Sequence, residues 1–432
     1  MERSKPVGIC IDDGKRQVVN VITWEQRKFK DVFDGLQNNT FSRADLNYES
    51  GAVKNVHYGD VLIKFGDFID VSKDELPFIT DESQTTKYNS SFLQDGDIII
   101  ADTAEDSTVG KCSEIVGFQG VKLLSGLHTI PCRPKEKYAP KFMGYYINSD
   151  AYHKQLIPLM QGIKVTSISK SALQETDMIL PKSFEEQAQI GEYFSNIDHL
   201  ITLHQRKCDE MKKMKKFMLQ KMFPKNGQKN PEIRFDGFTD DWEQRKLGEV
   251  VEKVTTKNND TQYIETFTNS AELGIMSQRE YFDHDVSNIE NISGYYIVEN
   301  DAFVYNPRIS TSAPVGPINR NKLGRTGVMS PLYTVFKVNG IDSEYLEWYF
   351  KSTGWHSFMK FNGDSGARSD RFSIKDSVFF EMPIPTPDID EQEKIGEYFS
   401  SLDHLITLHQ RKCNWLKKLK EYMLKNIFQR YK

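Results

Sequence analysis

The sequence predicts an α+β protein with a pseudo-two-fold internal repeat, in which two similar mixed α/β domains are separated by two long helices packed as an antiparallel coiled coil. This prediction rests on two repeated strings. A repeated string is expected to form the same structure and play the same physical role in each copy. The string IGEYFSNIDHLITLHQRKC at 190–208 returns at 395–413 with two substitutions. WEQRKFKDV at 24–32 returns as WEQRKLGEV at 242–250. Divergent blocks separate the copies, so the order is block, constant helix, block, constant helix.

These repeats and a connector rich in Pro, Gly and Asn divide the chain into six segments. The approach to the second block contains PEIRF, whereas the N-terminal leader does not. The expected segments are a divergent leader (1–23), a first block (24–183), a first conserved helix (184–223), the connector (224–241), a second block (242–386) and a second conserved helix (387–432).

The two blocks share little literal sequence but keep the same order of features. Each has a strand that leads into a loop of small residues, at 95–111 and 299–319. A second strand and an aromatic amphipathic helix follow, and a glycine-led polar loop closes each block. The shared order indicates one fold used twice, and the divergent loops indicate two different ligands.

Each repeated helix carries an apolar stripe at steps of three and four residues, the spacing of a coiled coil. A stripe of this kind needs a partner, and the other copy is the obvious one. The predicted helix-helix seam is Ile190, Phe194, Ile197, Ile201, His204, Cys208 and Met211 with Ile395, Phe399, Leu402, Ile406, His409, Cys413 and Leu416.

Polar residues interrupt this stripe at equivalent positions in the two copies. We interpret His204 and His409 as packing histidines in preference to metal ligands or general bases. Lys215 and Lys420 are expected to fix the register of the helices, as polar residues at such positions do in coiled coils.

The composition is that of a globular protein, with 38% apolar and 27% charged residues in 432. No apolar run long enough for a membrane span and no secretory h-region occur, so we expect a cytoplasmic protein. The five cysteines form no metal-binding spacing and are expected to be small buried hydrophobes. The net charge of −5 argues against a uniformly basic nucleic-acid binder, so charge must be judged segment by segment.

The loops of both blocks carry donors suited to phosphates and base edges. Arg, Asn and Gln make two-point contacts with bases in the major groove, although surface Lys and Arg are common in any protein. The DNA-binding candidates are Lys54, His57, Lys111, Lys164, Thr166 and Lys170 in the first block and Gln278, Arg279, Asn306, Arg308, Arg320, Lys322, Arg325, Arg368 and Arg371 in the second.

The sequence lacks the motifs of a self-contained enzyme. There is no phosphate-binding P-loop, dinucleotide-binding GxGxxG, HExxH or GxSxG string, and Asn306-Pro307-Arg308 is not the signature of adenine methyltransferases. We therefore expect no catalytic residues, no bound metal and no cofactor held by this chain.

The repeated helices, the connector and the alternation of blocks together resemble the specificity (S) subunit of bacterial type I restriction-modification systems. The resemblance covers 24–432. It implies that each block is a target-recognition domain reading one half of a bipartite, asymmetric DNA site, and that the helices set the unread spacer. It also implies two methyltransferase (M) subunits with S-adenosylmethionine for adenine-N6 methylation, and restriction (R) subunits with ATP and Mg²⁺ for cleavage.

Two alternatives remain open at this level. One is a methyltransferase or nuclease with fused recognition domains, which would modify or cut DNA unaided. The other is a stand-alone DNA-binding coiled-coil protein, which would bind its site tightly without partners.

Overall fold

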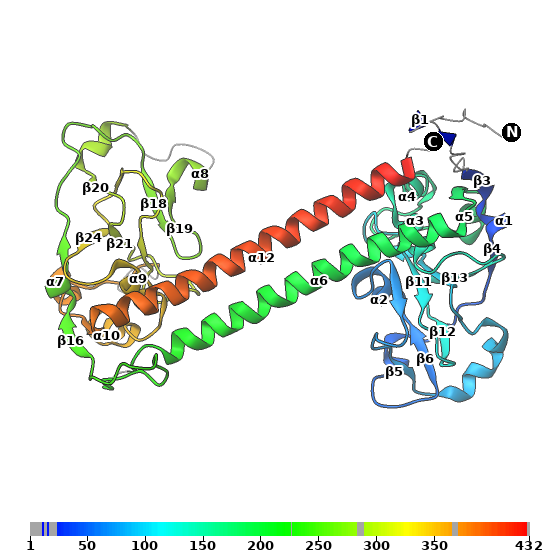
Figure 1. Cartoon of the computed structure of the whole chain (residues 1–432), viewed down its shortest axis with the longest axis horizontal. Coiled ribbons are helices and arrows are strands. Elements are labelled where there is room, and N and C mark those ends of the chain that lie inside the picture. The colour runs from blue at the N-terminus through cyan, green and yellow to red at the C-terminus, as the bar shows by residue number, and fades with distance from the viewer. Residues whose placement is uncertain are drawn as a thin grey trace. The chain divides into compact units, whose positions relative to one another are not determined.

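The computed structural model describes residues 11–12, 15–16, 24–225, 227–282, 289–364 and 370–429. The chain forms two compact units, the first comprising Met1–His204 with Arg411–Lys432 and the second Gln205–Gln410. Figure 1 labels the elements, and each unit is considered by itself. Within the described ranges, no helix combines the length and apolarity needed to cross a bilayer.

The first unit contains two main sheets. One has the order β4-β13-β9-β11-β7 and is antiparallel except for β11 and β7; the other has the order β12-β6-β8-β5, with β12 and β6 parallel. Their bounds are β4 Phe33–Gly35, β13 Thr129–Pro134, β9 Ile98–Ala101, β11 Cys112–Val116 and β7 Phe68–Asp70, then β12 Lys122–Ser125, β6 Val53–Val56, β8 Phe78–Ile79 and β5 Leu46–Asn47. The run of three isoleucines in β9 is fully buried, as expected of a central strand.

Short elements connect these sheets. They are β1 Ile11–Asp12, β2 Lys15–Arg16, β3 Trp24–Lys28, α1 Phe29–Val32, η1 Arg43–Asp45, α2 Tyr58–Ile63, η2 Glu82–Ser91, β10 Thr103–Ala104, α3 Phe142–Asn148, α4 Asp150–His153, η3 Ile157–Leu159, β14 Thr166–Ser167, α5 Lys170–Gln174 and β15 Asp177–Pro181.

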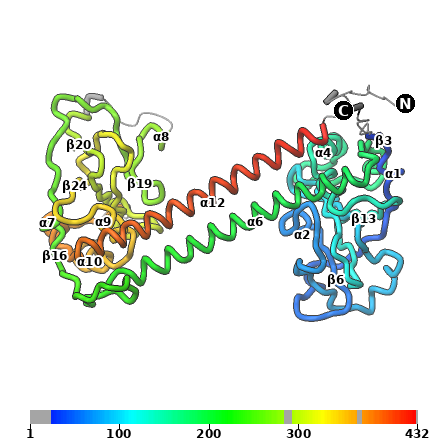
Figure 2. The backbone as a smooth tube through the Cα atoms, in the orientation of Figure 1, coloured from blue at the N-terminus to red at the C-terminus, as the bar shows by residue number. Residues whose placement is uncertain are grey.

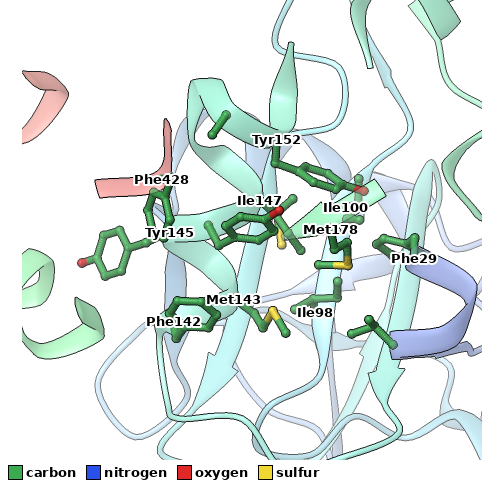
Figure 3. Packing of buried hydrophobic residues seen from close by; sticks show 14 of the residues in the cluster. Phe29, Ile98, Ile100, Phe142, Met143, Tyr145, Ile147, Tyr152, Met178 and Phe428 are labelled. Atoms are coloured by element: carbon green, nitrogen blue, oxygen red, sulfur yellow. The ribbon is translucent and has the colours of Figure 1, made fainter. Parts of the chain in front are cut away.

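The core of the first unit includes side chains from the last part of the chain, among them Leu416 and Phe428. Phe428 packs against Phe142 and Tyr146 of α3 and Phe194, with ring centroids 6.2, 5.4 and 6.3 Å apart. Figure 3 shows Phe428 beside Tyr145 and Phe142 at one side of the cluster, with the β9 isoleucines Ile98 and Ile100 at the other side. The C-terminal turn is therefore part of the hydrophobic core.

The second unit is built on the antiparallel sheet β17-β24-β21-β22, with the hairpin β18–β19 and the antiparallel pair β20–β23 beside it. Its elements are β16 Glu243–Lys246, α7 Leu247–Val250, β17 Val251–Lys253, β18 Phe267–Ser270, β19 Gly274–Ser277, α8 Gln278–Phe282, η4 Ile289–Gly294, β20 Tyr296–Val298, β21 Phe303–Tyr305, β22 Ile318–Arg320, β23 Gly327–Met329, β24 Thr334–Val338, α9 Ser343–Lys351, α10 His356–Asn362, α11 Asp376–Phe379 and β25 Pro383–Thr386. An aromatic core that includes Phe303, Phe336 and Trp348 lies beneath it.

The repeated WEQRK strings play the same part in both units. The first forms β3, which pairs antiparallel with β15; the second forms β16, which pairs antiparallel with β25. In each case the partner strand directly precedes a long helix. The repeated strings therefore close the base of each unit against its helix.

The long helices are α6, Phe184–Lys221, and α12, Ile389–Gln429. In the first unit, Cys413 Sγ of α12 lies 4.0 Å from the Ile201 carbonyl of α6. In the second, Cys208 Sγ of α6 lies 3.9 Å from the Ile406 carbonyl of α12. Figure 2 shows the C-terminal end of α12 beside the start of α6 within the first unit. The predicted α+β class with two similar units is confirmed, while regular coiled-coil packing stays a prediction.

Candidate functional site

A groove of about 800 Å³ opens on the second unit. Four loop segments and one short helix line it: the end of β18 with its turn, α8, the segment after β21, residues 330–333, and Arg371. Some of the candidate donors of the second block lie on these segments. The groove gathers Gln278, Asn306, Arg308 and Arg371 from three separate stretches of sequence, with Asn306 and Arg308 on the same one.

Arg308 and Arg371 lie directly opposite each other on two antiparallel segments. The flanking hydrogen bonds run from Ile309 N to the Asp370 carbonyl, 3.0 Å, and from Phe372 N to the Pro307 carbonyl, 2.7 Å. This is the pattern of a non-hydrogen-bonded pair, the arrangement that brings opposed side chains closest. The side chain of Arg308 is 65% exposed, and its ion pair with Asp370 is long, at 3.7 Å.

A network of asparagines holds the loop that carries Arg308. Asn306 donates to the Asn269 carbonyl at 2.8 Å and accepts from Arg308 N at 3.0 Å. Asn269 donates to the Val304 carbonyl at 2.7 Å and accepts from Asn319 at 2.7 Å. The Asn306 amide is thus engaged inside the protein, and its part in the groove is to position Arg308.

Gln278, the first residue of α8, lines the groove and carries a buried acceptor. Its Oε1 is buried, and the described part of the chain supplies no hydrogen-bond donor to it. A buried polar atom without a partner is costly, so the atom is suited to a donor on a ligand. Arg279, the next residue, is exposed and does not line the groove.

The other cations predicted in the second block are held by carboxylates. Arg320 is buried and bonds Glu347 at 2.9 Å, and Lys322 reaches the same carboxylate at 3.2 Å. Arg325 makes a two-point contact with Glu265, at 2.8 Å for each bond, and this hydrogen bonding raises the pKa of Arg325. The donors of Arg320, Lys322 and Arg325 are therefore engaged in ion pairs within the protein and stabilise the fold. Arg368 lies outside the described residues.

Two of the first-block candidates, Lys111 and His57, are held by internal contacts. Lys111 donates to the Leu62 and Phe65 carbonyls at 2.8 and 2.9 Å, and its burial lowers the pKa. His57 caps α2 by accepting from Gly59 N at 3.1 Å; burial and the nearby Arg43 lower its pKa.

The remaining first-block candidates lie nearer the surface. Thr166 donates to the Asp106 carbonyl at 3.1 Å, and Lys54 lies over the ring of Phe78 at 5.3 Å. Lys164 and Lys170 are exposed. Of the described candidates in this block, these two lysines therefore offer the most accessible charges.

The predicted seam residues are all buried or half-buried, and none of them is exposed. Buried positions are Ile190, Phe194, Ile197, Cys208, Ile395, Phe399, Leu402, Cys413 and Leu416; Ile201, His204, Met211, Ile406 and His409 are half-buried. The cysteines at 112, 132, 208 and 413 are buried, as expected, and form no disulfide with one another; burial raises the pKa of Cys132 to about 12. Cys10 lies outside the described residues.

The seam lysines make ion pairs that the sequence analysis missed. In the first unit, Lys420 bonds Asp67 and Asp198 at 2.7 Å and lies 5.0 Å from the centre of the Tyr145 ring. Burial opposes its charge, but the two carboxylates outweigh it and raise its pKa. In the second unit, Lys215 pairs with Asp403 and lies 4.5 Å from the Trp348 ring, and burial lowers its pKa.

Apolar side chains remain exposed on the outer faces of the helices. In the first unit they are Tyr193, Leu200, Trp415 and Tyr422, and in the second Met214, Phe217, Leu405 and Leu408. Several large apolar residues on one helix face are typical of protein interaction surfaces.

The comparisons with known proteins agree with this arrangement. The family model "Type I restriction modification DNA specificity domain" matches twice, at residues 22–213 and 239–418. The putative type I restriction enzyme MjaX specificity subunit of Methanocaldococcus jannaschii is 22% identical over 424 residues, covering 93% of this chain and 92% of the relative. The MjaVIII specificity subunit of the same organism is 23% identical over 283 residues, covering 61% of this chain and 64% of the relative.

A solved structure shares the fold. The crystal structure of the type I restriction-modification S subunit from M. genitalium superposes with a TM-score of 0.53 at 12% identity, covering 95% of this chain and 97% of that one. The family model matches well over half of the chain, in two copies that each contain one divergent block. The chain therefore belongs to the type I restriction-modification DNA specificity family, whose members are non-catalytic DNA-recognition components.

Proposed function

We propose that this chain reads a bipartite, asymmetric DNA site and determines the DNA sequence specificity of a type I restriction-modification complex. The observation that carries the proposal is the double match to a DNA specificity domain, each copy closed by the same WEQRK strand and the same helix. One recognition unit used twice, with different loops, suits two different half-sites. The chain contributes recognition and its partners contribute chemistry.

The groove of the second unit supports this proposal by its donor set. Guanidinium and amide groups are the side chains that recognise base edges, and backbone phosphates are neutralised by Lys and Arg. The overall charge of −5 fits this assignment because only part of the surface faces DNA. In the first unit, Lys164 and Lys170 are the exposed candidates for phosphate contacts.

Two M subunits would dock on the exposed apolar faces of the helices, one face in each unit. The repeated helix sequence provides equivalent surfaces for two copies of one partner. The M subunits would carry S-adenosylmethionine for adenine-N6 methylation, and R subunits would use ATP and Mg²⁺ to cleave unmodified DNA. The helices would set the spacer between the half-sites, since α6 and α12, of 38 and 41 residues, span roughly 57 and 62 Å at about 1.5 Å per residue.

Methylome sequencing tests the proposal in a host that lacks adenine methylation. The host expresses this chain with its neighbouring M subunit, and control hosts express either protein alone. N6-methyladenine within a split motif, only when both proteins are present, supports the proposal. Methylation by this chain alone would favour a self-contained methyltransferase, and an unmethylated genome with a demonstrably active M subunit would contradict the assigned role.

A further inference from the structure

We propose that Arg308 and Arg371 read guanine in the second half-site, with Gln278 accepting a hydrogen bond from an exocyclic amine of a base. The inference rests on the proposed function and deepens it, because it names residues and the base that they recognise. It starts from an arrangement that is unfavourable for the protein on its own.

The two arginines are opposed in a position that costs stability. Side chains across a non-hydrogen-bonded antiparallel pair have Cβ atoms about 5 Å apart, and like charges there destabilise the pairing. The carboxylate of Asp370, at 3.7 Å from Arg308, compensates weakly. For Arg371, no side-chain carboxylate of the described chain lies within ion-pair distance. A ligand rich in acceptors would relieve this repulsion.

The neighbouring arginines show what a structural role looks like in this unit. Arg320 is enclosed with Glu347, and Arg325 is matched by Glu265 through two bonds. Their guanidinium donors already have carboxylate acceptors. Arg308 and Arg371 instead line the groove, so their planar donor forks remain available to a ligand.

Gln278 distinguishes a base edge from a phosphate. A phosphate offers only acceptors to the protein, whereas the unpartnered atom of Gln278 is itself an acceptor, Oε1. Base edges present both kinds of group: guanine offers N7 and O6 to an arginine fork, and adenine or cytosine offers an exocyclic amine. The combination of two guanidinium groups and one buried acceptor therefore matches base edges.

The test is methylome sequencing of hosts that express the M subunit with wild-type chain or with Arg308→Ala, Arg371→Ala, Arg308→Lys or Arg371→Lys. Lys360→Ala is the control, since Lys360 is an exposed cation of the second unit that does not line the groove. Each Ala variant at Arg308 or Arg371 should relax the requirement for guanine at one position of the second half-site, by roughly 5- to 100-fold in discrimination. The first half-site should be unchanged in these variants, and the whole motif should be unchanged in Lys360→Ala.

The lysine variants keep the charge but lose the fork, so they keep the inference falsifiable if an alanine variant is inactive. Relaxation at guanine in the lysine variants supports base reading. Uniformly weaker methylation with an unchanged motif, in the alanine and the lysine variants alike, would overturn it in favour of phosphate contacts. A wild-type second half-site with no guanine on either strand would also overturn it. Failure of the proposed function is distinguishable, because the wild type would then give no split motif.

Discussion

Lys420 of α12 donates to both carboxylate oxygens of Asp198 in α6, at 2.7 and 2.8 Å, inside the first unit. The equivalent pair in the second unit is Lys215 of α6 with Asp403 of α12. The two lysines occupy the same position of the repeated helix, and so do the two aspartates. Each helix thus gives a lysine to one unit and an aspartate to the other. The sequence repeat is therefore also a repeat of ion pairs.

Lys420→Met should lower the free energy of unfolding by about 2–3 kcal/mol, because it leaves Asp67 and Asp198 together without their shared cation. Differential scanning calorimetry measures the effect, with the exposed Lys418→Met as the control. Lys215→Met should cost less, since Lys215 pairs with one carboxylate. A melting temperature for Lys420→Met equal to that of the control would contradict the structural role.

Glu391→Gln and Glu186→Gln should have unequal effects although both residues occupy one repeat position. Glu391 binds Trp242 at 3.0 Å and takes two bonds from Arg234, at 2.7 and 2.8 Å. Glu186 binds Trp24 at 3.0 Å, but its Oε2 is buried and unpartnered among the described residues. Removing a carboxylate that serves a largely buried arginine costs more than removing one with an unpaired oxygen.

We expect a loss of about 2 kcal/mol for Glu391→Gln and less than about 0.5 kcal/mol for Glu186→Gln. Thermal unfolding of the two single variants beside the wild type measures both. Equal losses would show that the two carboxylates are equivalent in energy as well as in position.

Glu114 should make stability depend on pH. Its carboxylate accepts from Lys141 N at 2.6 Å and from Gly144 N at 3.0 Å at the start of α3, yet burial raises its pKa to about 7. The folded state therefore holds the proton more tightly than the unfolded chain, whose glutamate titrates near pH ~4.3. Its contribution is fully present below that pH and declines, by roughly 3 kcal/mol, as pH rises to about 7.

The measurement is the difference in free energy of unfolding between the wild type and Glu114→Gln from pH 4 to 8. The Gln variant removes the titration, so the difference should fall across this window and level off above it. A difference that rises with pH would show that the helix N-terminus, rather than burial, governs this carboxyl group.

Gly191→Ala and Gly396→Ala should destabilise the protein, although Ala normally favours a helix by about 1 kcal/mol over Gly. A Cβ at Gly191 would lie 2.7 Å from the Pro140 carbonyl oxygen, and one at Gly396 would lie 2.9 Å from Glu344 Cβ. Both glycines hold the same repeat position and let a neighbouring segment approach the helix closely. Thermal unfolding beside the exposed control Ser401→Ala checks this; stabilisation by either change would contradict the close packing.

The repeats made the architecture predictable, because periodic apolar positions and duplicated strings are local properties of the sequence. Ile190 and Phe194, the first two positions of the predicted stripe, are buried, while the seam between the two helices stays a prediction. The pairing of Lys420 with Asp67 could not be predicted from the sequence, since it joins positions far apart in the chain. It depends on a tertiary contact that no sequence period encodes.

The hydrogen-bond donors of the loops show most clearly what could not be predicted from the sequence. Arg308 and Arg320 look alike in sequence, yet one is exposed and the other is buried with Glu347. The strand alternation gave a usable signal for Arg320, because it lies two residues from the buried Ile318 and shares its face. Nothing comparable marks Arg308 or Arg371, whose opposition depends on how two loops meet.

The central claim is that each block reads one half-site, and that the repeated WEQRK strand and long helix hold the two blocks in equivalent ways. The most direct test replaces residues 242–386 with a second copy of 24–183 and sequences the methylome of a host that also expresses the M subunit. Because the repeat has pseudo-two-fold character, the account predicts a symmetric motif made of two inverted copies of the first half-site. Methylation that retains the original second half-site would contradict the claim.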